Sequence, residues 1–154
     1  SKEGSMGIII NKKIDHDLYP DLLKQLGIDQ PFKNKKFFIR YGGPIESRRG
    51  FILHSDDLIR KETLSIDKGV ALTNTAEFFD DLAKNSGPKY SILALGYTGW
   101  GPGQLEYEIK KNSWVNLPIE SSFLFDEKVT TKWTDAYKLM GINSSNLSLF
   151  SGNA

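Results

Sequence analysis

Short apolar runs separated by polar turns recur along the chain and predict a β-sheet. Residues 7–10 form an unbroken apolar run, typical of a strand that is covered on both faces near the middle of a sheet. Residues 62–66 and 70–73, joined by a tight turn at 67–69, are expected to form a hairpin. The other predicted strands are residues 36–41, 50–54, 91–95, 114–115 and 122–125. Residues 45–49 are expected to connect two of these strands.

Apolar residues at helical spacing predict four helices. Their ranges are 18–26, 75–84, 104–111 and 126–141. Asp17 is expected to cap the first helix, and Asn74 with Glu77 has the spacing of a capping box for the second. The expected buried side chains are Leu22, Leu23, Leu26, Phe78, Phe79, Leu82, Trp114, Trp133, Ala136, Tyr137 and Met140. Strands alternating with helices predict a single α+β or mixed α/β domain over residues 1–154, with a polar tail from about 143.

Composition excludes several classes of function. The chain has 154 residues, of which 39% are hydrophobic and 25% charged, as expected of one globular domain. It contains no cysteine, which excludes disulfides, thiolate catalysis and cysteine zinc sites. A net charge of +1 makes DNA an unlikely partner. No apolar run approaches the roughly 20 residues that span a bilayer, so we expect a cytoplasmic protein without membrane contact.

Three long segments together resemble the bacterial YqgE/AlgH family. They are YGGPIESRRGFILHS at 41–55, LTNTAEFFDDLA at 72–83 and LGYTGWGPGQLEYEIKKNSWVNLP at 95–118. The segments GIIINK at 7–12 and FDEKVTTKWTDAYKLMGIN at 125–143 fit as well, so the resemblance covers nearly the whole chain.

The resemblance implies a fold more than a function. It implies a compact α+β domain whose bent, bifurcated mixed sheet forms a pseudo-barrel with helices packed outside. The family is largely uncharacterised, a transcriptional role has been suggested for one branch, and no agreed catalytic residues can be carried over. Family members usually begin with a further strand, turn and strand before the residues that match 4–11. Without that segment we expect an exposed sheet edge, which favours dimerisation or instability. Asn153 stands where the family pattern leads us to expect histidine.

A glycine-rich loop is predicted between the strand at 91–95 and the helix at 104–111. Glycines before a helix can leave N–H groups directed at an anion, and aromatic residues between them could form the walls of a pocket. Alternatively, the glycines allow a sharp turn while Trp100 fills the core. The loop lacks the Gly-Lys-Ser/Thr ending of a phosphate-binding loop. The candidate residues are Gly96, Tyr97, Gly99, Trp100, Gly101 and Gly103.

A second glycine turn lies at the end of the strand 36–41. Arginines beside such a turn could clamp a carboxylate or phosphate, or could instead pair with nearby acidic residues at the surface. The candidate residues are Tyr41, Gly42, Gly43, Arg48 and Arg49. His54 could act as a base, but its adjacent Ser55 points to the opposite face of a strand. A histidine that bonds the local backbone is the alternative.

These residues favour a non-enzymatic binding or regulatory protein. Its site would join the loop at 96–103 to the turn at 41–50, and would take a small anion or a protein partner. One alternative is a hydrolase or phosphatase-like enzyme using His54, Arg48 and the glycine loop. A second is a transcriptional regulator. We expect no cofactor and no metal, and either a monomer or a weak homodimer.

Overall fold

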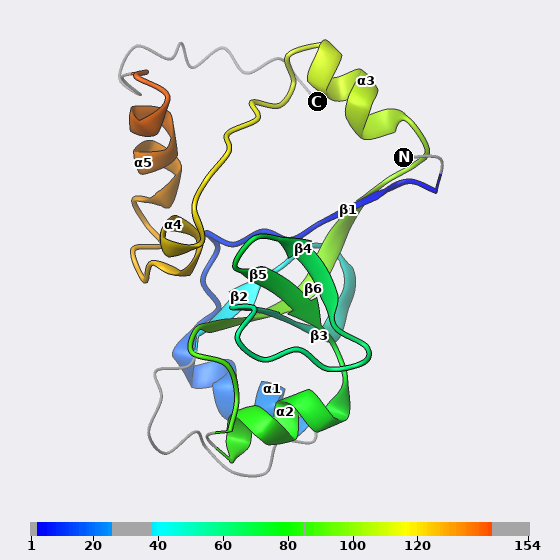
Figure 1. The fold of residues 1–154 in the computed structure, drawn as a ribbon, viewed down its shortest axis with the longest axis vertical. Helices are drawn as coiled ribbons and strands as arrows, with labels where there is room; N and C mark the ends of the chain where they lie inside the picture. The colour runs from blue at the N-terminus through cyan, green and yellow to red at the C-terminus, as the bar shows by residue number, and fades with distance from the viewer. Residues whose placement is uncertain (1–2, 26–37, 85, 143–154) are drawn as a thin grey trace.

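The computed structural model describes residues 3–25, 38–84 and 86–142 (Figure 1). The strands are β1 (Ser5–Gly7), β2 (Ile39–Tyr41), β3 (Ile45–His54), β4 (Leu64–Asp67), β5 (Val70–Thr73) and β6 (Ser91–Trp100). The helices are the 3-10 turn η1 (His16–Leu18), α1 (Tyr19–Gln25), α2 (Ala76–Ala83), α3 (Gln104–Lys110), α4 (Ser121–Phe125) and α5 (Lys132–Leu139). Predictions for residues 36–37, for Leu26 and for the tail from 143 lie outside the described residues.

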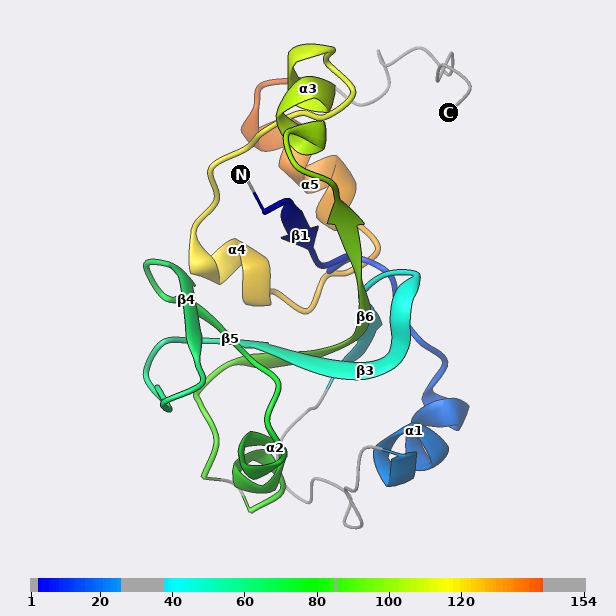
Figure 2. The same cartoon turned by 90° about the vertical axis from the view of Figure 1, so that its right-hand side faces the viewer.

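Among the described residues, one mixed sheet runs in the order β1-β6-β3-β5-β4, with β2 parallel to β6. The long strands β3 and β6 pair antiparallel at its centre, and the sheet curls strongly (Figure 2). β1 and β2 both pair with the same edge of β6, but at different positions along it. The sheet is therefore bifurcated at this edge. This arrangement confirms the expected α+β fold.

Helices cover the two faces of the sheet unequally. α1 and α2 lie on one face, and α3, α4 and α5 lie on the other side (Figures 1 and 2). The face under α2 holds the larger core, formed by Ile39, Ile52, Phe78, Phe79, Leu82, Leu93 and Leu95. The opposite, concave face has a smaller core of Leu53, Val70, Ile92 and Leu124, the last from α4. The predicted buried stripe of α2 is therefore confirmed, and the hairpin of β4 and β5 also forms as expected.

Two strand predictions were wrong in their placement. The first strand is residues 5–7 at one edge of the sheet, and residues 8–10 are only half-buried. The reason is that the chain leaves β6 after Gly7 and passes beside β2, where the Ile9 N–H donates to the Gly42 carbonyl. Residues 45–49 are not a connector, because β3 already begins at Ile45, opposite Tyr97, before an irregularity in the pairing.

The second half of the chain departs further from expectation. Residues 122–125 lie in helix α4 rather than a strand, residues 114–115 form no strand, and α5 begins only at Lys132. Trp114 and Trp133 are 49% and 50% exposed, so neither is a core residue. Thr75, not Asn74, is the N-cap of α2, and it makes no side-chain capping bond. No helix in the described part of the chain is long and apolar enough to cross a bilayer.

Candidate functional site

The two predicted glycine segments meet in the structure, backbone against backbone. The Gly42 N–H donates to the Leu95 carbonyl at 2.7 Å. A Cβ atom on Gly43 would collide with the Tyr97 backbone, and one on Gly96 would collide with the Gly43 carbonyl. These glycines therefore allow the backbone of β6 to approach the turn before β3 closely. No room for a ligand remains between β6 and this turn.

The predicted loop at 96–103 is mostly strand. β6 continues through Trp100, because Tyr97 pairs with Ile45 on one side and residues 98–100 pair with β1 on the other. Only residues 101–103 lie between β6 and α3, and the Gly101 N–H donates to Gln104 Oε1 at 2.9 Å. The Gly101 N–H is therefore not a free donor.

Glu108 on α3 joins two tryptophans, a contact that the sequence pattern did not reveal. Its Oε2 accepts from the indole N–H of Trp100 at 3.1 Å and of Trp114 at 2.6 Å. Gln104 Nε2 donates to the other carboxylate oxygen at 2.9 Å. These hydrogen bonds, that from Trp114 foremost, lower the pKa of Glu108 below its usual range. The cluster anchors α3 to the end of β6.

His54 is fully buried under α2, and its two ring nitrogens are both engaged. Nδ1 lies 2.8 Å from the Ser55 carbonyl and must donate to it, so in the neutral ring Nε2 is the acceptor. The hydroxyl of Thr73, 2.9 Å away, donates to that Nε2. Burial lowers the pKa of His54, although the hydrogen bond to the Ser55 carbonyl and the charges of Asp57 and Asp56 oppose this effect. The ring also packs on Phe78, so it is closed to a substrate.

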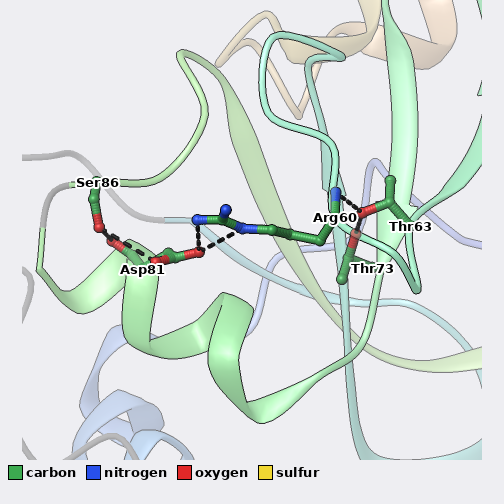
Figure 3. A network of polar contacts seen from close by, with 5 residues as sticks. All are labelled: Arg60, Thr63, Thr73, Asp81 and Ser86. Carbon is green, nitrogen blue, oxygen red and sulfur yellow. Dashed lines mark hydrogen bonds and ion pairs between the residues drawn. The ribbon is translucent and has the colours of Figure 1, made fainter.

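The hydrogen bonds continue from Thr73 to the loop before β4 (Figure 3). Thr63 Oγ1 lies 2.8 Å from Thr73 Oγ1 and accepts from the Arg60 N–H at 3.0 Å. The Arg60 guanidinium binds Asp81 of α2 through two contacts of 3.2 and 2.8 Å. Every group in this network bonds another protein group, so we assign it a structural role.

Arg49 pairs locally, as one interpretation expected. Its guanidinium lies 2.9 Å from Glu46 Oε2 at an exposed position. Glu46 Oε1 also accepts from the Tyr97 hydroxyl at 3.4 Å. Arg48 and Arg49 border a shallow hollow with Pro44 and Ser47.

Among residues 3–25, 38–84 and 86–142, no cluster of three acidic or histidine residues could hold a metal ion.

The concave face of the sheet carries a hollow of two adjoining parts. We call it the concave groove. One part, of about 710 Å³, is bordered by the predicted site residues Arg49, Tyr97, Gly99 and Trp100. The other part, of about 470 Å³, has an apolar lining that includes Ile8, Ile10, Ile66 and Val70. The two parts share Met6, Leu64 and Leu72, so they adjoin.

The remaining predicted site residues lie elsewhere. Tyr41, Gly42, Gly43, Arg48, His54, Gly96, Gly101 and Gly103 do not border either part of the groove. Lys12 Nζ lies 4.3 Å above the ring of Tyr41, which is half-buried. Leu64, Ile66 and Met6 were missed, although the alternation of Leu64 and Ile66 on a strand was a usable signal.

Comparison with known proteins is consistent across sequence and structure. A profile of the AlgH-like family matches residues 1–145. A UPF0301 protein from Beijerinckia indica is 44% identical over all of this chain and 79% of its own, and one from Rhodospirillum rubrum is 40% identical over 99% and 79%.

Two solved structures are similar to this one. The AlgH protein from Pseudomonas aeruginosa is 33% identical with a TM-score of 0.78, and the match covers all of this chain and 82% of that one. A Corynebacterium diphtheriae protein shares the fold, with a TM-score of 0.65 at 16% identity over 90% and 72% of the two chains. This chain belongs to the AlgH-like family.

Proposed function

We propose that this protein is a non-enzymatic binding protein whose concave groove holds an apolar segment of a partner protein. The observation that carries the proposal is the exposure of apolar side chains around the groove. Leu64 is 59% exposed and Met6 is 45% exposed, and both border its two parts. A contiguous exposed apolar surface of this kind is typical of protein interaction sites.

The polar groups near the groove favour a protein segment over a small anion. Its nearest predicted cation, Arg49, is paired with Glu46. The backbone N–H groups of Gly42 and Gly101 already have acceptors. An anion entering the groove would therefore find few free donors, whereas an apolar side chain would be removed from water.

The enzyme alternative has little support from the geometry. A general base must reach a substrate proton, and His54 is buried with both nitrogens bonded to protein groups. The second alternative, a transcriptional regulator that contacts DNA directly, is weakened by the net charge of +1. Regulation through association with another protein is compatible with the proposed groove.

The test uses Nile red as an apolar probe, with its fluorescence followed as protein is added. We expect Leu64→Lys to weaken probe binding roughly tenfold, because a lysine would place a charge in the apolar groove. Leu139→Lys is the matched control, since Leu139 is 61% exposed on α5 and does not border the groove. Equal binding by both variants would refute the groove as the site.

The anion alternative is tested separately. Backbone amide NMR spectra are recorded while phosphate and then pyrophosphate are added. We expect no saturable shift at Gly99, Gly101 or Gly103. Saturable shifts at these three amides would instead favour the anion site and weaken the proposal.

A further inference from the structure

Arg40 is a buried cation that the proposed function does not use. It lies in β2 and is only 2% exposed, although arginine is seldom buried unless it is paired. Successive side chains of a strand point to opposite faces, so Arg40 points away from the core that contains Ile39 and toward the side of α4 and α5 (Figure 2). It does not border either part of the concave groove.

The contacts of Arg40 leave one edge of its guanidinium without an acceptor. Its Nη1 donates at 3.4 Å to the Ile39 carbonyl, which also accepts from the Tyr19 hydroxyl at 3.3 Å. The guanidinium carbon lies 4.8 Å from the centroid of the Phe38 ring, a contact that uses the face of the group rather than its edge. Nε is buried and bonds no group in the described part of the chain. The edge that contains Nε can therefore donate to a further acceptor lying in the guanidinium plane.

The charge of Arg40 is not neutralised by an ion pair with any residue that the structure describes. Burial lowers the pKa of Arg40, whereas Tyr19 and Glu127 raise it. A guanidinium stays protonated in proteins, so the fold retains a positive charge at this position. A buried charge without a close partner destabilises the folded state, and an anion beside Arg40 would remove that cost.

Lys132 adds a second buried positive charge nearby. It is 5% exposed, and its ammonium group donates to the Phe123 carbonyl at 2.6 Å and to the Leu124 carbonyl at 3.3 Å. Burial lowers the pKa of Lys132 and the charge of Arg40 lowers it further, although nearby aspartates oppose this effect. The two buried cations are therefore close enough to repel each other, which increases the benefit of an anion beside them.

The guanidinium edge favours a small carboxylate over other anions. Two parallel N–H donors on that edge match the two oxygens of a carboxylate, and spherical ions cannot use this geometry as well. Asp126 and Glu127 also act on the two cations, so the local charge suits an anion of single rather than double charge. With 2% of Arg40 exposed, neither a macromolecule nor a further segment of polypeptide has much of its surface to contact.

We propose that a small carboxylate anion binds inside the protein against the Nε edge of Arg40, with Lys132 as a second source of positive charge. The site is separate from the concave groove, and the inference does not depend on the proposed function. The bound anion would stabilise the folded protein, because the unfolded chain does not hold these two cations together.

The probe is sodium formate labelled with ¹³C, the smallest carboxylate. Its carbon NMR line is followed as protein is added, and melting temperatures are measured at increasing formate concentration and constant ionic strength. We expect saturable binding and a rise in melting temperature. Arg40→Met should bind formate roughly tenfold more weakly, because methionine fills similar space without a donor. Arg40→Lys should lose a similar factor, because it keeps the charge but lacks the planar pair of donors.

Two control variants separate this site from other charges and from the groove. Lys128→Met removes the same charge from an exposed position in the loop before α5, and it should bind formate as the parent does. Leu64→Lys alters the groove and should also leave formate binding unchanged. Without formate, Arg40→Met should be at least as stable as the parent, because an apolar side chain replaces an uncompensated buried charge.

Four results would overturn the inference without affecting the proposed function. One is formate binding that does not saturate or that is equal in Arg40→Met and the parent. Equal binding by Arg40→Lys would show that the guanidinium edge is not needed. Saturable chloride binding without formate binding would contradict the choice of a carboxylate. A marked loss of stability in Arg40→Met without formate would mean that the protein already satisfies the charge of Arg40.

Discussion

The hydroxyl of Thr73 donates to Nε2 of His54 at 2.9 Å and so completes the hydrogen bonding of a buried imidazole. The other ring nitrogen donates to the Ser55 carbonyl, so the neutral ring has a single tautomer in this structure. The contact joins β3 to β5 beneath α2, where Phe78 covers the ring. A polar pair thus occupies a position in the larger core without leaving an unsatisfied ring nitrogen.

Replacing Thr73 by valine should destabilise the protein by about 1–3 kcal/mol, because Nε2 of His54 would lose its donor while remaining buried. Urea unfolding measures the change. Thr73→Ser should recover part of the loss, since it restores the hydroxyl. Thr130→Val, at an exposed position, is the control and should have little effect. A Thr73→Val protein as stable as the parent would mean that the hydrogen bond contributes nothing.

Stability should fall as pH decreases from 7.5 to 5.5. Burial lowers the pKa of His54 below its ordinary value of 6.5, so below about pH 6.5 the unfolded chain binds more protons than the folded one. The contribution of neutral His54 is therefore fully present above that pH, and it is lost progressively as pH falls toward the folded-state pKa. Urea unfolding at pH 7.5, 6.5 and 5.5 measures this trend.

The control for the pH experiment is His54→Gln. Glutamine does not titrate, so this variant should be less stable at pH 7.5 but should lose less stability on acidification. His16 is present in both proteins, so the comparison isolates the change at residue 54. Parallel pH profiles for the two proteins would show that His54 is not responsible.

Alanine at Gly96 should be far more disruptive than alanine at Gly103. Both glycines have φ of +72°, so each substitution places a side chain in the left-handed region at about 1–2 kcal/mol. A Cβ on Gly96 would also collide with the Gly43 and Ile45 carbonyls, which adds about 1–3 kcal/mol of overpacking, whereas a Cβ on Gly103 has open space. Thermal unfolding of Gly96→Ala and Gly103→Ala compares the two costs. Equal losses would mean that the backbone contact relaxes freely.

Local sequence pattern was sufficient for α2 and for the hairpin of β4 and β5. Phe78, Phe79 and Leu82 share one face of a short helix, and a tight turn at 67–69 joins two adjacent strands. Both features depend on residues close in sequence, and their apolar faces indicate which side is buried. The family resemblance supplied the α+β class.

Prediction from local sequence pattern failed where the structure of a segment depends on contacts with residues far along the chain. Residues 96–100 look like a glycine loop, but pairing with Ile45 and with β1 makes them strand, because only glycine lets the backbones approach so closely. Residues 122–125 look like a strand, yet they lie in the short helix α4, whose Leu124 packs with Leu53 and Val70.

The candidate site was likewise predictable only in part from the sequence. From sequence alone Tyr97, Gly99, Trp100 and Arg49 could be singled out, and the structure places all four beside the concave groove. Its opposite walls, Met6 and Leu64, lie 58 positions apart in the chain and meet only because the sheet curls. Composition and local spacing determine which segments can be strands and which faces are apolar. The curl of the sheet, which arises from the twist of all its strands together, decides which of those faces enclose a groove.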